Sequence, residues 1–556
     1  MTLERYREII PDWAEFLRAA RSPEPTTLRL RRREAGCNVV PELRALGFEL
    51  ESIDGLEGFH RVGLEPFPLS KTPGHWLGDF YIQQAVTGVA APALGARPGE
   101  RILDLCAAPG GKTTHLADVM EDAGIVVAVD PDAKRIRALL ANVYRLGHPN
   151  VLVVEADGRS FPASASFDRV LVDVPCSAEG NIRRYEGELR PRSSSFSEHI
   201  SGIQRSLLKR ALELVRPGGV VLYVTCTFAP EENEGVVDHV LRKSPGELEA
   251  IDLDLPHAPG LDSFEGRRYR DDLALAWRVY PHHLDSGGLF LARIRRPGVE
   301  VGSPAGVRHS GWSPVPARFP DEIAEGGGSG RRVPDPSTVD PPATGRSATH
   351  LPAGALSTTG HALLASLERI ERGVAGVRSY FGLEEALRNL QWIERGDSVW
   401  THRVPAWPVE SWDPGAGWRV ISLGIRALKQ DPRTAFGERP TGDFLRMMGA
   451  RVKKRVVDLE RNELLELLDR RSVELDGSPP DVSSPDRRPS DSRSGRMERN
   501  PEAIERGFVA VRHGGRILGR GWVKDGVLRN EISKVRSRRL LADLGARGTD
   551  DGGSDS

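Results

Sequence analysis

Two cysteines and one aspartate stand where they could do covalent chemistry on a pyrimidine ring. Asp173 and Cys176 lie in DVPCSAEG, Cys226 lies in VTCTFAPEENEG, and each motif ends an apolar run. A thiolate that adds to carbon 6 of a pyrimidine makes carbon 5 nucleophilic enough to accept a methyl group. For cytosine, a carboxyl group such as that of Asp173 can hydrogen-bond ring nitrogen 3 while charge develops there. The second thiol is available for proton loss and release, and the residues alone do not decide which cysteine attacks.

A loop of small residues could hold the methyl donor beside these side chains. The apolar stretch RILDL runs directly into CAAPGGKTTHLA, in which two glycines precede a helix-like segment. Such strand-to-helix turns approach nucleotide-like ligands closely. A Walker phosphate loop would need glycine at Cys106, and the dinucleotide pattern GxGxxG is absent. Asp130 ends the next apolar run and could bind both ribose hydroxyls of an adenosine cofactor, so S-adenosylmethionine is the predicted ligand.

These candidate residues need a scaffold that brings the ends of strands together. Between 96 and 298, helix-like segments alternate with the apolar runs RILDL, IVVAVD, NVLVVEAD, FDRVLVDV, VVLYVT and GLFLARI. The alternation predicts an α/β fold with a Rossmann-like, mostly parallel sheet covered on both faces. Ligands of open α/β sheets bind at the carboxyl ends of the strands, so Asp173, Cys176 and Cys226 are expected to meet at that edge.

The composition of the chain changes along its length and divides it into several units. A chain of 556 residues, 39% of them hydrophobic, is too long to fold around a single hydrophobic core. The net charge of −1 creates no overall attraction to polyanions, and no apolar run is long enough to span a membrane. No export signal is visible and the four cysteines form no CxxC pair, so we expect no metal site and a cytoplasmic protein. The predicted units are 1–95, a small α/β N-terminal subdomain; 96–298, the catalytic domain; 299–354, a disordered linker; 355–475, an α+β domain; 476–500, a disordered insert; 501–545, a small β domain; and 546–556, a disordered tail.

Three motifs together resemble one known family. LDLCAAPGGKT, DVPCSAEG and TCTFAPEENE have the order and spacing of the signatures of the Nop/Sun family of RNA cytosine carbon-5 methyltransferases. The similarity is strong over residues 70–296, and PTTLRLRRR more loosely resembles the family's RNA-binding N-terminal subdomain. The resemblance implies a seven-stranded, S-adenosylmethionine-dependent core in which Cys226 is the nucleophile and Cys176 assists release. Val224 stands where serine is common in the family, which alters neither thiol nor acid.

The same resemblance implies a set of cofactor contacts, namely Cys106, Ala107, Ala108, Pro109, Gly110, Gly111, Lys112, Asp130, Asp157 and Asp173. The C-terminal third is similar to the tail of bacterial RsmF-type ribosomal RNA enzymes, which carry a PUA-like domain, expected here at 501–545. In that context two basic runs are expected to contact RNA phosphates; they are Arg451, Lys453, Lys454 and Arg455, and Arg529, Lys534, Arg536, Arg538 and Arg539.

The partner that the resemblance implies is structured RNA, bound by a monomer. We expect 16S ribosomal RNA or the small ribosomal subunit, with transfer RNA as the alternative. A non-catalytic RNA-binding factor for ribosome assembly is a different class, disfavoured because a scaffold needs neither the two thiols nor the acid and the cofactor loop. A DNA methyltransferase is weakened by the thiol that follows the fifth strand.

Overall fold

The computed structural model describes residues 3–32, 39–161, 167–189, 193–298, 358–404, 418–475, 504 and 506–545. The predicted linker 299–354, insert 476–500 and tail 546–556 lie outside these ranges. Among the described helices, none is both long and apolar enough to cross a membrane.

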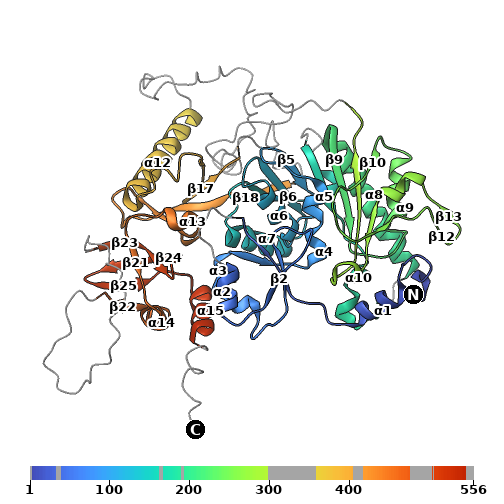
Figure 1. Cartoon of the computed structure of the whole chain (residues 1–556). Coiled ribbons are helices and arrows are strands. Elements are labelled where there is room, and N and C mark those ends of the chain that lie inside the picture. Colours follow the sequence, from blue (N-terminus) through green and yellow to red (C-terminus); the bar gives the residue numbers. More distant parts are fainter. Residues whose placement is uncertain are drawn as a thin grey trace, which may run out of the picture.

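A ten-stranded sheet forms the centre of the molecule (Figure 1). Its strands are β5 (Arg101–Asp104), β6 (Ile125–Asp130), β7 (Val151–Ala156), β8 (Phe167–Asp173), β9 (Val215–Thr225), β10 (Glu247–Glu249), β11 (Ala258–Pro259), β14 (Trp277–Val279), β15 (Leu289–Arg295) and β18 (Trp418–Leu423). The order is β11-β14-β15-β9-β8-β5-β6-β7-β18, and β10 pairs with β15. The strands from β9 to β7 are parallel, whereas β15 and β14 are antiparallel. The predicted Rossmann-like α/β core is confirmed, and β18, β10 and β11 extend it.

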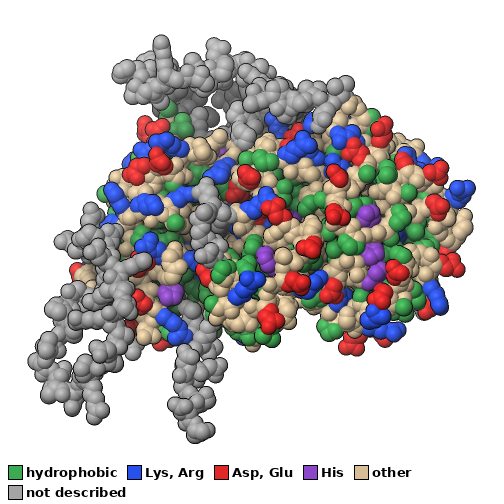
Figure 2. Space-filling view, in the orientation of Figure 1, with side chains coloured by type: hydrophobic (Ala, Val, Ile, Leu, Met, Phe, Trp, Pro, Cys, Tyr) green, Lys and Arg blue, Asp and Glu red, His purple; other side chains and the backbone are tan. Residues whose placement is uncertain are grey.

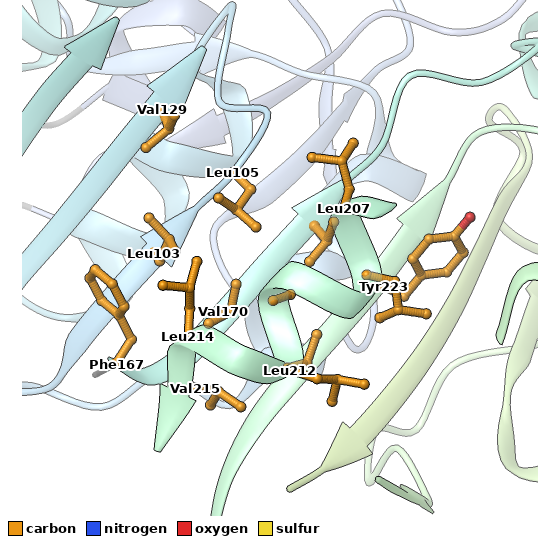
Figure 3. Packing of buried hydrophobic residues seen from close by; sticks show 14 of the residues in the cluster. Leu103, Leu105, Val129, Phe167, Val170, Leu207, Leu212, Leu214, Val215 and Tyr223 are labelled. Atoms are coloured by element: carbon orange, nitrogen blue, oxygen red, sulfur yellow. The ribbon is translucent and has the colours of Figure 1, made fainter. Parts of the chain in front are cut away.

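Helices cover both faces of this sheet because successive strand residues point to opposite sides. Ile102 and Leu103, neighbours on β5, belong to different hydrophobic clusters. Figure 3 shows the cluster on one face, where Leu214 lies beside Leu103 and Val170. This face is covered by α8 (Ser194–Leu214) and α9 (Glu234–Leu241), and the other by α5 (Ala90–Leu94), α6 (Gly111–Val119) and α7 (Ala133–Leu146).

The chain before the core builds a four-stranded antiparallel sheet of order β2-β3-β1-β4. Its elements, with the helices around it, are η1 (Leu3–Tyr6), α1 (Trp13–Arg21), β1 (Thr27–Leu30), α2 (Val39–Ala45), β2 (Leu50–Ser52), β3 (Phe59–Val62), η2 (Leu69–Lys71), α3 (Pro73–Leu77), β4 (Phe80–Ile82) and α4 (Ala85–Gly88). Within PTTLRLRRR, Arg29 pairs with Asp118 of α6, and Arg31 donates to Asp122 at 2.9 Å. Both arginines are buried in these contacts. They hold the subdomain to the core, so any RNA contact by 1–95 depends on other residues.

A second four-stranded sheet, of order β16-β17-β19-β20, follows in the chain. Its elements are α12 (Thr358–Phe381), β16 (Gln391–Arg395), β17 (Ser398–His402), β19 (Ile425–Gln430) and β20 (Glu438–Pro440). Between β17 and β19, the chain contributes β18 to the central sheet, where Val420 lies opposite Val154 of β7. Without β18, β7 would be an open edge with unpaired backbone groups. The unit predicted at 355–475 is therefore partly built into the catalytic sheet.

The last sheet has five strands in the order β21-β23-β24-β25-β22. The elements of this region are α13 (Gly442–Met448), η7 (Gly449–Arg451), β21 (Val456–Asp458), α14 (Arg461–Arg470), β22 (Ser472–Glu474), β23 (Arg506–His513), β24 (Arg516–Lys524), β25 (Val527–Asn530) and α15 (Lys534–Gly545). Because β21 pairs with β23 and β22 with β25, this one sheet takes strands from both sides of 476–500, which the sequence predicts to separate two domains. Figure 1 shows α15 beside α2 and α3, and Arg516 pairs with Glu42 at 2.5 Å.

The remaining short elements lie in loops of the catalytic unit. They are η3 (Gly158–Ser160), η4 (Glu179–Tyr185), β12 (Ser263–Phe264), β13 (Arg267–Arg268), η5 (Asp271–Leu275) and α10 (Pro281–Leu284).

Candidate active site

Cys176 and Cys226 follow the neighbouring parallel strands β8 and β9. Their Sγ atoms lie 3.3 Å apart. The backbone N–H of Gly180 donates to the carbonyl oxygen of Cys226 at 2.9 Å, which ties the two loops together. Both cysteine side chains keep some exposure to solvent. Two reachable thiols therefore share one site at the carboxyl edge of the sheet.

The two thiols are electrostatically unequal. A hydrogen bond donated by Cys176 lowers the pKa of Cys226, against burial and the charge of Asp173, and the Lys112 ammonium group also lowers it. The same hydrogen bond raises the pKa of Cys176 well above its usual range, aided by burial and by the carboxylate of Glu232. The arrangement favours Cys226 as the thiolate, which is the nucleophilic form, and Cys176 as the thiol.

Asp173 is paired with Lys112. The Nζ of Lys112, in the first turn of α6, donates to Oδ2 of Asp173 at 2.7 Å. Burial lowers the pKa of Lys112, but the attraction of Asp173 outweighs burial and raises it. The sequence places Lys112 among the cofactor contacts, whereas its ammonium group lies on the candidate catalytic carboxylate. The pair presents both a donor and an acceptor next to the thiols.

The small-residue loop lies between β5 and α6, as predicted. Gly110 has φ of 102°, and a Cβ atom there would lie 2.8 Å from Cδ1 of Leu139, so only glycine fits without strain. The backbone N–H of Ala108 donates to Oδ2 of Asp130 at 3.2 Å. Burial raises the pKa of the Cys106 thiol well above its usual range, which leaves it unreactive. The loop thus folds back onto the acid that ends β6.

The two remaining candidate cofactor acids end neighbouring strands. Asp130 is the last residue of β6 and is fully buried. Asp157 follows β7 directly, and its carboxylate accepts from the backbone N–H of Arg159 at 2.9 Å. Because β6 and β7 are parallel neighbours, both carboxylates lie at the same sheet edge as the loop.

Asp104, which the motif arguments do not single out, ends β5 at the base of this loop. Its Oδ2 accepts from Oγ1 of Thr113 at 2.8 Å, and its Oδ1 is buried with no hydrogen-bond partner in the described part of the chain. Burial raises the pKa of Asp104 to about 7. A buried carboxyl group with a free oxygen fits a ligand that carries hydroxyl and ammonium groups, as S-adenosylmethionine does. Its position at a strand end was the signal available in the sequence.

The sequence motifs also did not identify two polar residues of the thiol loops, Asn181 and Glu232, as part of the site. Nδ2 of Asn181 lies 3.9 Å from Sγ of Cys226 and is placed to donate to it. Oε2 of Glu232 accepts from the backbone N–H of Ser177 at 3.0 Å, and Glu232 is buried. The polar run PEENE, on the loop that follows the buried strand β9, was the signal for Glu232.

The basic runs of the C-terminal region divide into half-buried and exposed members. The guanidinium of Arg455 stacks 4.2 Å from the ring centre of Tyr380, and Arg536 lies 3.4 Å from Asp443. Figure 2 shows cationic and anionic side chains interspersed over one face of the molecule. The members that the structure shows exposed are Lys453, Lys454, Arg529, Lys534 and Arg538; the side chain of Arg539 lies outside the described set.

Comparison with known proteins gives a consistent result. A family model described as 16S rRNA methyltransferase RsmB/F matches residues 91–295. The chain is 34% identical over 298 residues to the tRNA (cytosine(49)-C(5))-methyltransferase of Pyrococcus abyssi, covering 53% of this chain and 95% of that protein. It is 37% identical over 263 residues to ribosomal RNA small subunit methyltransferase F of Erwinia tasmaniensis, covering 45% and 54%. It is 31% identical over 332 residues to a 28S rRNA (cytosine-C(5))-methyltransferase of Mus musculus, covering 58% and 42%.

The chain spans about half the length, or less, of the bacterial and mouse relatives. Among solved structures, it is similar to a methyltransferase homolog protein from Pyrococcus horikoshii, with 31% identity and a TM-score of 0.48 over 53% of this chain and 93% of that one.

Proposed function

Because the chain belongs to the RsmB/F methyltransferase family, we propose that it transfers a methyl group from S-adenosylmethionine to carbon 5 of a cytosine in RNA. The observation that carries the proposal is the 3.3 Å separation between the sulfur atoms of Cys176 and Cys226. Paired thiols suit a reaction that forms a covalent adduct with the base and must then resolve it. A protein that only binds RNA has no use for this pair.

S-adenosylmethionine supplies the methyl group from a positively charged sulfur. The loop from Cys106 to Lys112 and the start of α6 would hold it. The carboxylates at the ends of β5, β6 and β7 would also contact it; they belong to Asp104, Asp130 and Asp157. We assign Asp130 to the ribose hydroxyls, and Asp104 offers a buried oxygen with no hydrogen-bond partner among the described residues.

The side chains of the site divide the reaction among them. The thiolate of Cys226 adds to carbon 6 of a cytosine that has left its stack, forming a carbon–sulfur bond and making carbon 5 nucleophilic. The Lys112–Asp173 pair hydrogen-bonds the ring as charge develops at nitrogen 3. After methylation the carbon 5 proton passes to a water molecule acting as base, its electron pair restores the double bond between carbons 5 and 6, and the thiolate of Cys226 is expelled. Cys176 assists this release.

We propose ribosomal RNA of the small subunit as the substrate. The family description and the Erwinia relative support it. Transfer RNA is the second candidate, supported by the Pyrococcus relative, because this chain matches 95% of that protein. A monomer that acts in the cytoplasm stays a prediction.

The test is methyl transfer to defined RNAs. The full chain is incubated with labelled S-adenosylmethionine and either 16S ribosomal RNA, small subunits or transfer RNA, and bisulfite sequencing then locates 5-methylcytosine. We expect modification of a single cytosine in the ribosomal RNA. Cys226→Ala should bind the cofactor normally and lose at least about 10⁴-fold in turnover, because carbon 6 addition is abolished.

Three results would count against the proposal in different ways. Methylation of transfer RNA alone would move the substrate to the second candidate. Wild-type turnover by Cys226→Ala, or no methylation of any RNA by the wild-type chain, would overturn the mechanism or the activity.

A further inference from the structure

Residues 3–23 pack against the two thiol loops. Tyr6 and Phe16 share a hydrophobic cluster with Ile182 and Phe228, which lie a few residues beyond Cys176 and Cys226, respectively. The rings of Tyr6 and Phe228 meet edge to face with centres 6.2 Å apart. Figure 1 shows the start of the chain beside α10, at the catalytic unit. This segment therefore covers the loops that carry the thiols.

A chain of buried hydrogen bonds runs from this segment to the residues that follow the two cysteines. The hydroxyl of Tyr6 donates to Oε2 of Glu179 at 2.9 Å, and Oγ1 of Thr227 donates to the same oxygen at 3.1 Å. Oγ1 of Thr227 lies 2.6 Å from Oγ of Ser177. Ser177 and Thr227 directly follow Cys176 and Cys226. The Tyr6 hydroxyl is thus the outer end of a polar chain that joins both thiol loops.

Ion pairs and backbone contacts pin the same segment at its two ends. Arg5 pairs with Glu231 on the loop after Cys226. Nε of Arg183, on the loop after Cys176, donates to the carbonyl oxygen of Ser22 at 3.0 Å. The segment is therefore held by both loops and cannot shift against one without disturbing the other.

We propose that Tyr6 is a positioning residue for the thiol pair, acting through Glu179 and Thr227. Its hydroxyl fixes the Glu179 carboxylate, which holds the loops at the separation that lets Cys176 donate to Cys226. Loss of one donor leaves a buried carboxylate oxygen underbonded, so Glu179 would move or admit water. A small displacement of reacting groups lowers the rate without lowering affinity for the substrate. The consequence for turnover rests on the proposed function, whereas the consequence for the thiols does not.

The experiment compares Tyr6→Phe with Tyr280→Phe in the full chain. Tyr280 lies in the same cluster, but its hydroxyl donates to the carbonyl oxygen of Ile9 at 3.1 Å, outside the Glu179 chain. The first measurement needs no RNA or cofactor: iodoacetamide alkylates Cys226, forming a carbon–sulfur bond and releasing iodide, and mass spectrometry follows that peptide across pH. Tyr6→Phe should move the midpoint of alkylation to higher pH, because Cys226 loses the aligned donor, while Tyr280→Phe should keep the wild-type midpoint.

The second measurement is methyl transfer. Tyr6→Phe should lower kcat by about tenfold with KM for RNA unchanged within about twofold, and Tyr280→Phe should keep the wild-type kcat. Equal effects of the two variants on alkylation, or none from Tyr6→Phe, would overturn the positioning role. If the wild-type chain methylates no RNA but Tyr6→Phe still moves the alkylation midpoint, the proposed function fails and the positioning role stands.

Discussion

At the scale of residues, a shared hydrogen bond and the surrounding charges make two chemically identical thiols unequal. The pKa of Cys226 is lowered first by the hydrogen bond with Cys176 and also by Lys112, against burial and Asp173. The pKa of Cys176 is raised by the same hydrogen bond, by burial and by Glu232. Two thiols 3.3 Å apart cannot both ionise cheaply, because like charges at that distance repel strongly. This charge pattern favours one thiolate and one proton-bearing thiol.

This charge pattern predicts a pH dependence. Because its lowered pKa makes Cys226 a thiolate at lower pH than an ordinary thiol, the single-turnover rate of methyl transfer should reach its plateau at correspondingly lower pH. Lys112→Met removes the positive charge, so the pKa of Cys226 rises and the ascending limb of the pH–rate profile moves to higher pH. Lys134→Met, which removes an exposed lysine of α7, serves as the control and should leave the limb in place. An unmoved limb in Lys112→Met would show that Lys112 does not act on the thiolate.

At the scale of elements, the site is made where parallel strands end. Adjacent strands β8 and β9 put the two cysteine loops side by side, and β5, β6 and β7 line up the carboxylates for the cofactor. The small-residue loop lies between these two groups, since β5 pairs with both β6 and β8. Its tight turn allows a ligand to approach the backbone.

The geometry of the small-residue loop predicts how adding one methyl group at Gly110 affects stability and cofactor binding. Gly110→Ala should destabilise the protein by about 1–2 kcal/mol, because its Cβ meets Leu139 and the residue keeps a positive φ. Affinity for S-adenosylmethionine should fall with it. Gly202→Ala is the matched control on α8, where no heavy atom lies within 4 Å of the new Cβ, and it should stabilise the protein by roughly 0.5–1 kcal/mol. Thermal unfolding and titration calorimetry measure both, and wild-type cofactor affinity in Gly110→Ala would contradict the role of the turn.

At the scale of the whole molecule, the C-terminal region is joined to both the catalytic unit and the N-terminal subdomain. Strand β18 completes the edge of the central sheet. The five-stranded sheet contacts the N-terminal subdomain through Arg516 and Glu42, and Leu77 of α3 packs in its hydrophobic cluster. The exposed basic residues of this region are thus held at a fixed orientation to the thiols, which suits recognition of a structured RNA.

A charged side chain placed between β18 and β7 should detach β18 from the central sheet. Val420 is fully buried, so Val420→Lys would place an unpaired charge in the core at a cost of about 3 kcal/mol or more. Hydrogen exchange should speed up over both β18 and β7. Arg419→Ala, which removes an exposed side chain with a 3.2 Å pair to Glu155, should change stability by at most about 1 kcal/mol. Unchanged protection of β7 in Val420→Lys would contradict the docking.

The sequence by itself determined the parallel α/β core, the loop before α6, and the meeting of Asp173, Cys176 and Cys226 at one sheet edge. It could do so because a parallel sheet repeats one rule: successive strands point the same way, so residues that end the strands gather at the same edge. Asp104 ends such a strand, and Glu232 lies on the loop after one. Polar residues are common at these positions, so the sequence does not single out these two without knowledge of their contacts.

Only the tertiary structure decided that Lys112 pairs with Asp173, that Tyr6 reaches Glu179, and that β18 closes the edge of β7. Lys112 and Asp173 are 61 positions apart in the sequence, and Tyr6 and Glu179 are 173 positions apart. Such contacts depend on how separately formed units pack, and no local pattern of hydrophobic and polar residues encodes which surface each unit will meet. The same reason explains why one C-terminal sheet draws its strands from both sides of 476–500.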